Sequence, residues 1–188
     1  MTKKRQKPII HHIEVIAKSH LFTVEAVDLE FSNGVRRVFE RMRPLGRDSV
    51  MIVPIVDNNL VLIEEYAVGV ESYQIGFPKG LIDGDEAILM AANRELKEET
   101  GFGAKKMEIL SKLTMSPAYF SGVMNIVVAE GLYQEKLQGD EPEPLIVRYW
   151  PVNDMMALLN KPGFDEARNV SALFLVREWL RKHERIIA

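Results

Sequence analysis

The chain has 188 residues, of which 47% are apolar and 27% charged, with a net charge of −3 and no cysteine. These values fit one ordinary soluble domain with a small appendage, and the weak negative charge gives no general attraction to nucleic acid or acidic membranes. The lack of cysteine excludes disulfide scaffolds, thiolate metal sites and cysteine nucleophiles. No apolar run reaches the length of a membrane span, and the N-terminus has no signal-peptide pattern, so we expect a cytoplasmic protein.

The first part of the chain has the pattern of a small antiparallel sheet. Alternating apolar and polar residues predict strands over residues 9–18, 21–31 and 35–43. Ser32-Asn33-Gly34, between the last two strands, is a strong hairpin signal. We therefore expect this sheet to occupy residues 1–46, and a second, main domain to occupy residues 47–188.

The main domain is expected to mix strands with helices. Its strands are predicted at 51–56, 60–63, 105–116, 122–130 and 145–150, and its helices at 85–100, 152–160 and 167–184. The first helix has neither proline nor glycine, and Gly101 stands where a helix C-cap belongs. Strands alternating with helices in this way predict an α/β or α+β sandwich.

The helix at 85–100 places carboxylates where apolar residues are expected. At about 100° per residue, its sheet-facing side is defined by Ile88, Ala92 and Leu96. Glu95 and Glu99 fall within about 20° of this side and Glu98 about 80° from it. Asn93 and Lys97 are predicted to face solvent.

Three ionised carboxylates near one edge repel one another and lose hydration unless a cation gathers them. Oxygen ligands without His or Cys indicate a hard divalent ion, Mg²⁺ first and Mn²⁺ second, and Mg²⁺ favours phosphate oxygens as further ligands. The alternative is a surface helix whose acids pair with lysine at i to i+4. The angular placement favours the metal site and a phosphate-bearing substrate.

Residues near this helix extend the candidate site. Gly80, between a strand and the helix, would let a backbone carbonyl approach a bound ion, although a plain turn glycine explains it equally well. Glu86 is expected at the helix start, where a carboxylate suits the dipole. Arg94 would pair with Glu86 or brace Glu98 at i+4. In isolation Glu86 and Arg94 would be structural, but we include them in the catalytic set.

The spacing of these residues carries a resemblance. Nine fixed positions of the Nudix box are matched, by Gly80, Glu86, Arg94, Glu95, Leu96, Glu98, Glu99, Gly101 and Phe102. The sequence thus resembles the Nudix hydrolase superfamily. The resemblance implies an α/β/α sandwich with a mixed sheet, and Mg²⁺-dependent cleavage of a diphosphate linked to a nucleoside. It also implies that Glu98 and Glu99, with Glu95 and the Gly80 carbonyl, hold the metal.

The whole chain is similar to the ADP-sugar pyrophosphatase branch, whose box follows a small N-terminal sheet. This likeness implies a homodimer formed with help from that sheet, in which each subunit contributes to the adenosine pocket of the other. Pro117 and Tyr119 match branch markers on the substrate side. A turn proline and a half-buried tyrosine explain these two residues almost equally well.

Departures from the branch bear on substrate range. Many ADP-ribose pyrophosphatases carry Arg and Glu where this chain has Ala67 and Gly76, and Lys79 replaces a small residue. We therefore expect a class of ADP compounds that includes ADP-ribose, NADH and diadenosine triphosphate, with AMP and a phosphorylated remainder as products.

A carboxylate outside the metal cluster must accept a proton from water. The acidic loop at 139–144 supplies two candidates, and the resemblance favours Glu141, with Glu143 as second choice or metal ligand; an exposed acidic turn is the alternative. For the adenosine side we expect Tyr119 or Phe120 to stack and Arg41 to meet phosphate or base. Core packing and a surface arginine are the competing interpretations.

Two other functions compete. A Nudix-fold sensor could bind ADP-ribose or NAD without cleaving it, but the intact Glu95, Glu98 and Glu99 argue against this. A hydrolase of sugar nucleotides such as GDP-mannose would share the dimeric architecture. In each case the partner is a small molecule, without nucleic acid or membrane.

Overall fold

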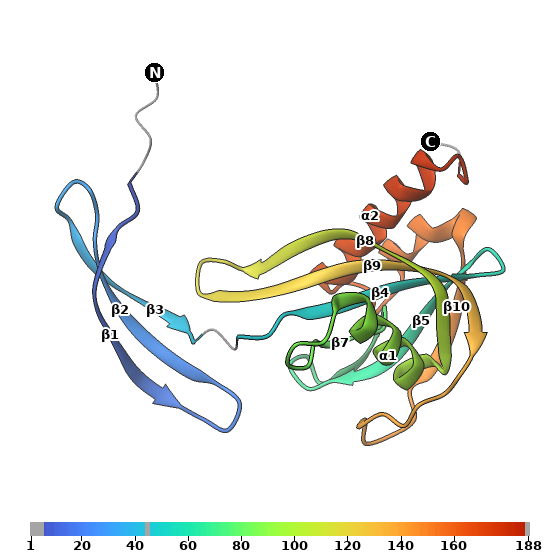
Figure 1. The fold of residues 1–188 in the computed structure, drawn as a ribbon, viewed down its shortest axis with the longest axis horizontal. Helices are drawn as coiled ribbons and strands as arrows, with labels where there is room; N and C mark the ends of the chain where they lie inside the picture. Colours follow the sequence, from blue (N-terminus) through green and yellow to red (C-terminus); the bar gives the residue numbers. More distant parts are fainter. Residues whose placement is uncertain (1–5, 44–45, 187–188) are drawn as a thin grey trace. The chain divides into compact units, whose positions relative to one another are not determined.

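The computed structural model describes residues 6–43 and 46–186, and the chain divides into two compact units. The first takes the described residues up to Gly46 together with residues 114–122. The second takes residues 47–113 and those from 123 onward. Figure 1 traces the elements of each unit along the chain.

The first unit contains a three-stranded antiparallel sheet in the order β1-β2-β3, formed by β1 (Ile9–Lys18), β2 (Thr23–Glu30) and β3 (Arg36–Met42). The predicted hairpin turn is confirmed: Gly34 has φ +80°, and the Asn33 Oδ1 accepts a 3.1 Å hydrogen bond from the Val35 amide. At the other end of β3, the Met42 amide donates to the Tyr119 carbonyl at 2.8 Å. This bond ties residues 114–122 to the sheet.

The second unit alternates strands and helices. Its elements are β4 (Ser49–Val56), β5 (Asn59–Ala67), β6 (Ser72–Gly76), β7 (Lys79–Leu81), α1 (Ile88–Thr100), β8 (Phe102–Ser116), β9 (Phe120–Gln134), β10 (Ile146–Pro151), the 3₁₀ helix η1 (Val152–Asn160) and α2 (Ala167–Lys182). The tip of the β8–β9 hairpin is the 114–122 segment of the first unit. Each predicted strand and helix is present; β5, β8 and β9 are longer than expected, and β6 and β7 were not predicted.

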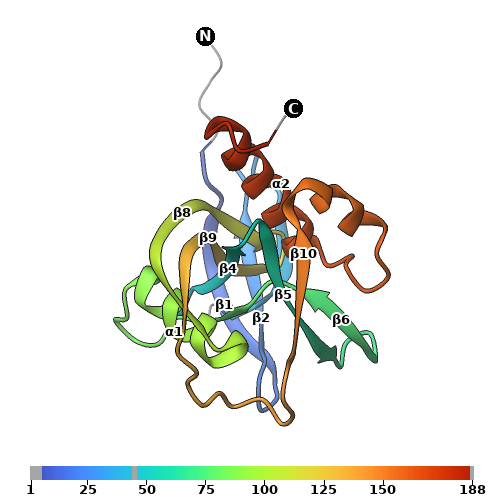
Figure 2. The same ribbon diagram turned by 90° about the vertical axis from the view of Figure 1, so that its right-hand side faces the viewer.

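Strand β4 is the centre of a mixed sheet. In the described residues the strand order is β10-β5-β4-β9-β8, with β6 paired to β5 and β7 to β4. Strand β4 runs parallel to β9 and antiparallel to β5 and β7. It is apolar on both faces, and Ile52 and Val53 are fully buried. In Figure 2, α1 and the C-terminal helices cover opposite sides of these strands, which confirms the predicted sandwich.

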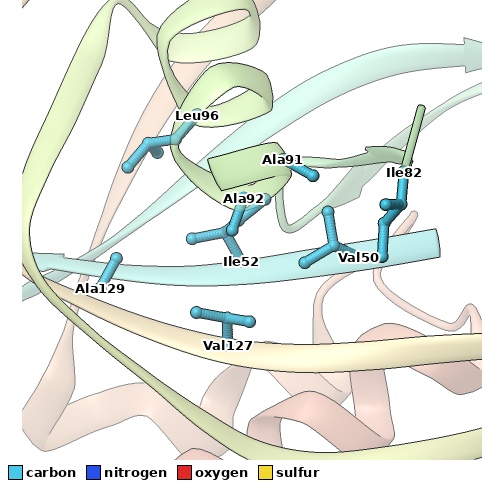
Figure 3. Close-up of a cluster of buried hydrophobic side chains, with 8 residues drawn as sticks. All are labelled: Val50, Ile52, Ile82, Ala91, Ala92, Leu96, Val127 and Ala129. Atoms are coloured by element: carbon cyan, nitrogen blue, oxygen red, sulfur yellow. The ribbon is translucent and has the colours of Figure 1, made fainter. Parts of the chain in front are cut away.

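Helix α1 packs on the sheet through small and branched residues. Figure 3 shows side chains of α1 directed at β4 and β9 in one cluster, which consists of Val50, Ile52, Ile82, Ala91, Ala92, Leu96, Val127 and Ala129. The two alanines let the helix approach the strands closely. This close packing also brings Glu95 and Glu99 of α1 close to the strands.

The ends of α1 differ in how well the sequence predicts them. Gly101 takes the left-handed conformation (φ 82°), and its amide donates to the Lys97 carbonyl, as expected for a C-cap. The N-terminal boundary was wrong: the helix begins at Ile88 rather than Asp85. Residues 83–86 form a turn in which the Glu86 amide donates to the Asp83 carbonyl at 2.9 Å.

Within residues 6–43 and 46–186, no helix is both long and apolar enough to cross a membrane.

Candidate active site

Two glutamates of α1 are buried against β7. Glu95 is 9% exposed and Glu99 5%, as the angular pattern predicted. Gly80 makes this possible: a Cβ at Gly80 would lie 2.0 Å from the Glu95 carboxyl carbon, so a side chain there would displace the Glu95 carboxylate. Gly80 belongs to the short strand β7 rather than to a connecting loop. Its missing side chain therefore provides the space for the Glu95 carboxylate.

Arg94 gathers the carboxylates around it. Its Nε and Nη2 donate to Glu86 at 3.2 and 2.9 Å, and Nη2 also donates to the Leu81 carbonyl at 2.9 Å. Its Nη1 donates to Glu95 at 2.7 Å and to Glu98 at 3.0 Å. Both partners expected for Arg94 are therefore present at once. The Arg94 hydrogen bonds lower the pKa of Glu86.

Among the described residues, Glu99 has no ion-pair partner of this kind. Its carboxylate accepts a hydrogen bond from the Lys79 backbone amide at 2.9 Å. Burial raises the pKa of Glu99 to about 8, with smaller raising effects from Glu95 and Glu141 and an opposing one from Lys79. Burial also raises the pKa of Glu95, against the effect of Arg94. The site thus holds buried acids whose charge the protein compensates incompletely.

Three expected positions need correction. Glu86 precedes α1 and lies in the turn before it, so it serves Arg94 and not the first turn of the helix. Asn93 and Lys97 are half-buried instead of facing solvent. The Asn93 side chain accepts from the Ala104 amide at 2.9 Å, and Lys97 pairs with Glu135 at 3.0 Å. The prediction from 100° per residue assumed that only one side of α1 packs against the protein. A second side of α1 contacts β8 and the end of β9, and it includes Asn93 and Lys97.

The donor set suits a hard divalent ion. The carboxylates of Glu95, Glu98 and Glu99 and the Gly80 backbone supply only oxygen ligands. Burial raises the pKa values of Glu95 and Glu99, so a nearby cation would stabilise their ionised forms. In the described part of the chain, no three acidic or histidine side chains converge as a preformed metal cage. The reason is visible in the contacts, since Arg94 draws Glu95 and Glu98 toward itself.

The acidic loop separates the two candidate bases. Glu141 is half-buried, and its charge reaches both Glu95 and Glu99, whose pKa values it raises. Gly139 lies between Glu141 and Glu98, because a Cβ there would be 2.3 Å from the Glu141 Oε2 and 3.7 Å from the Glu98 Cβ. Glu143 is exposed and turned elsewhere, where it accepts a 2.6 Å hydrogen bond from the Tyr73 hydroxyl. The loop therefore brings Glu141, and not Glu143, toward the acids of α1.

The residues expected on the adenosine side belong to the first unit. Arg41 pairs with the buried Glu25 at 3.1 Å. Tyr119 is exposed, Phe120 is half-buried with its ring against Gly122, and Pro117 is exposed. The first unit also contains a cavity of about 400 Å³, lined by Lys7, Pro8, Ile10, Val27, Leu29, Phe31, Phe39, Glu40, Arg41 and Ala118. Arg41 is thus the expected residue that lines a cavity in this unit.

Comparison with known proteins agrees with this geometry. Residues 46–174 match the NUDIX domain, and residues 8–41 match the NudE-type Nudix hydrolase N-terminal domain. The chain belongs to the Nudix hydrolase family. It is 65% identical to the ADP compounds hydrolase NudE of Escherichia coli K12 over 99% of this chain and all of that protein.

A more distant relative and a solved structure agree with this assignment. An ADP-ribose pyrophosphatase of Bacillus subtilis is 26% identical, over 85% of this chain and 90% of the relative. A crystal structure of an ADP compounds hydrolase superposes with a TM-score of 0.96 at 65% identity, covering 98% of this chain and 100% of the other. The predicted family, fold and enzyme class are therefore confirmed. Nudix hydrolases generally need a divalent metal ion.

Sequence reasoning missed two residues that the structure places in charged clusters. Glu25 is buried and receives both Arg41 and Arg43, the latter at 2.7 Å. Its register opposite Arg41 in the β2–β3 pairing was a usable signal. Glu65 pairs with Lys79 at 2.6 Å, between strands that are far apart in sequence and not neighbours in the sheet, so no local pattern could reveal it.

Proposed function

We propose that this Nudix hydrolase cleaves the phosphoanhydride bond of ADP-linked compounds, among them ADP-ribose, NADH and diadenosine triphosphate. The products are AMP and a phosphorylated remainder. The observation that carries the proposal is the 65% identity to an ADP compounds hydrolase over the whole chain, with every fixed position of the box intact. The departures at Ala67 and Gly76 favour several ADP compounds over strict ADP-ribose specificity.

Glu95, Glu98, Glu99 and the Gly80 carbonyl would hold Mg²⁺, with Mn²⁺ as a substitute. When bound, such an ion neutralises diphosphate charge and acidifies a water molecule. Arg94 positions the side chains of Glu95 and Glu98 by holding one oxygen of each. The remaining carboxylate oxygens are then free to act as ligands.

Glu141 accepts the proton from the attacking water at its carboxylate in this proposal. It stands close enough to Glu95 and Glu99 to influence their charge. Its half-buried carboxylate lies outside the set of acids proposed to hold the metal ion, as a base should. Glu143 is the second choice because the Tyr73 hydroxyl already occupies one of its oxygens.

On the adenosine side, Tyr119 or Phe120 would stack on the base, with Pro117 shaping their turn and Arg41 meeting phosphate or base. Arg41 and Arg43 share one carboxylate, Glu25, so the trio keeps a net positive charge. That excess charge suits an anionic nucleotide.

We also propose a cytoplasmic homodimer formed with the N-terminal sheet. Ile13, Val27 and Phe39 lie side by side across its three strands, and the first and last are 42% and 46% exposed. A second copy would cover this apolar face. Ile13→Lys should convert the dimer to a monomer in analytical ultracentrifugation; an unchanged dimer would show that this face is not the interface.

One substrate panel tests the catalytic proposal. Purified protein with Mg²⁺ is given ADP-ribose, NADH, diadenosine triphosphate, ADP-glucose and GDP-mannose, and the products are separated. We expect AMP from several of the ADP compounds and little turnover of GDP-mannose. Tight binding of ADP-ribose without cleavage would indicate a sensor instead, and preferred cleavage of GDP-mannose would indicate a sugar-nucleotide hydrolase of a different base specificity.

A further inference from the structure

Lys79 stands directly before the glycine that accommodates Glu95. Its backbone is firmly placed: the preceding Phe77 is fully buried and its amide donates to Asn169 at 2.8 Å, while the Pro78 carbonyl accepts from the Ile52 amide at 2.8 Å. The Lys79 amide holds Glu99, and its ammonium group reaches Glu65 at 2.6 Å. One residue thus contacts the acidic site with its backbone and carries a positive charge beside it.

Two other cations near these acids, Arg94 and Lys136, are bonded to groups of α1 or of the turn before it. Arg94 has five N–H donors, and its five hydrogen bonds to Glu86, Glu95, Glu98 and Leu81 use all of them. Lys136 donates to the Glu98 carbonyl in the last turn of α1, which satisfies a helix terminus. Arg94 therefore has no donor left for a further anion, and Lys136 is held at the end of α1.

Lys79 is different in this respect. An ammonium group has three donors, and among the described residues Glu65 is its hydrogen-bond partner, through a single oxygen. The Lys79 side chain is 24% exposed and Glu65 43% exposed, so the pair is open to solvent on one side. The charge of Lys79 also reaches Glu99, whose pKa it lowers. A partly desolvated ammonium group, bonded to one carboxylate oxygen of Glu65, therefore lies at the edge of the carboxylate cluster.

We propose that Lys79 is a phosphate-binding residue, whose ammonium group contacts a non-bridging oxygen of the substrate's phosphate chain while Glu65 holds it in place beforehand. The contact deepens the proposed function and rests on it, because it assigns a protein ligand to the same diphosphate. A longer phosphate chain carries more charge and more oxygens within reach of a flexible lysine. Lys79 therefore favours dinucleoside triphosphates over compounds with two phosphates.

The first test is binding, which needs no turnover. Isothermal titration calorimetry with Mg²⁺ measures the affinity of α,β-methylene ADP, whose phosphate bridge resists hydrolysis, for the wild type and Lys79→Met. We expect about tenfold weaker binding for the variant, as for one lost charge-assisted hydrogen bond. Lys79→Arg should recover part of the affinity, because it restores the positive charge.

A matched control removes a lysine from an ion pair outside the site. Lys182 lies 3.9 Å from Glu178 on α2, and Lys182→Met should leave the affinity unchanged. Equal affinity for Lys79→Met and the wild type overturns the proposal, as does undetectable binding to the wild type. A loss in Lys136→Met in place of Lys79→Met would also overturn it, by assigning the phosphate contact to the end of α1.

The second test separates the inference from the proposed function. In Lys79→Met we expect KM for diadenosine triphosphate to rise more than KM for ADP-ribose, with kcat little changed for both, because a binding contact is lost and the acids of α1 remain. Equal rises for the two substrates overturn the chain-length preference. If the wild type binds the methylene analogue but cleaves no ADP compound, the hydrolase proposal fails while the binding result still decides the role of Lys79.

Discussion

Two buried glutamates, one in each unit, have opposite electrostatic environments. Glu25 and Glu99 are both 5% exposed. Glu25 receives Arg43 at 2.7 Å and Arg41 at 3.1 Å, and these hydrogen bonds lower its pKa. Glu99 receives a backbone amide, and burial raises its pKa to about 8. The pKa values of the two carboxylates thus shift in opposite directions: hydrogen bonds from arginine lower that of Glu25, whereas desolvation raises that of Glu99.

The difference separates a structural acid from a functional one. A carboxylate with two guanidinium partners is stable in the protein as it stands, and it has no need of a further cation. A buried carboxylate with one amide and a distant lysine charge costs stability until a cation arrives. A bound cation would therefore stabilise the ionised form of Glu99, as expected for the proposed metal ligand.

The largest expected effect comes from replacing each of these two glutamates by glutamine. Glu99→Gln should lower turnover roughly 10³-fold, because a ligand oxygen and its charge are lost without loss of volume. Its thermal stability should stay the same or rise, since the amide is neutral at every pH and needs no proton to be buried. Glu25→Gln should instead lower the melting temperature, because two arginines lose their partner. Unchanged turnover in Glu99→Gln would reject the metal assignment.

The next largest effect concerns the acidic loop. Glu141→Gln should reduce kcat by about 10²-fold or more, because the base that accepts the proton is removed, while substrate affinity stays close to that of the wild type. It should also lower the pKa of Glu99, since one nearby negative charge disappears. Glu143→Gln is the matched control on the same loop and should retain most activity. The reverse ranking of the two variants would assign the base to Glu143.

Arg94 offers a test within the acidic site itself. Arg94→Met leaves Glu86, Glu95 and Glu98 without their guanidinium partner, so we expect the free energy of unfolding in urea to fall by about 2–3 kcal/mol. Turnover should fall about 10–100-fold because the metal-holding side chains lose their orientation. Arg181→Met removes an exposed pair with Glu178 and should change neither quantity appreciably. Equal stability of the two variants would mean that Arg94 contributes no more than a surface arginine.

Most of the fold could be predicted from sequence because its signals are local. Gly34 and Gly101 take positive φ (80° and 82°), and each marks a turn or a helix end where one was expected. The apolar run of β4 identified a central strand. The start of α1 could not be placed, because the turn at 83–86 depends on the contact of Glu86 with Arg94, two turns into the helix.

The site was predictable as far as one helix carries it. The burial of Glu95 and Glu99 could be predicted from the 3.6-residue period of the helix. The role of Gly80 could be predicted from its fixed sequence spacing to these glutamates. The Glu65–Lys79 pair and the Tyr73–Glu143 hydrogen bond join segments 14 and 70 residues apart. Such contacts depend on how strands are placed in the sheet, which periodicity does not specify.

The pH dependence of stability in metal-free protein measures the two environments directly. Unfolded Glu99 titrates near 4.5, and burial raises the folded pKa to about 8. Between these values the folded state keeps a proton that the unfolded state releases, so the contribution of Glu99 falls as pH rises from 4.5 to about 8. Glu25 has the opposite sign: its contribution is complete above 4.5 and is lost as pH falls through its lowered folded pKa. Urea unfolding in EDTA, from about pH 3 to about pH 8, should therefore show a decline at both ends. Glu99→Gln should remove the alkaline decline and Glu25→Gln the acid one, whereas an alkaline decline that persists in Glu99→Gln would mean that another group causes it.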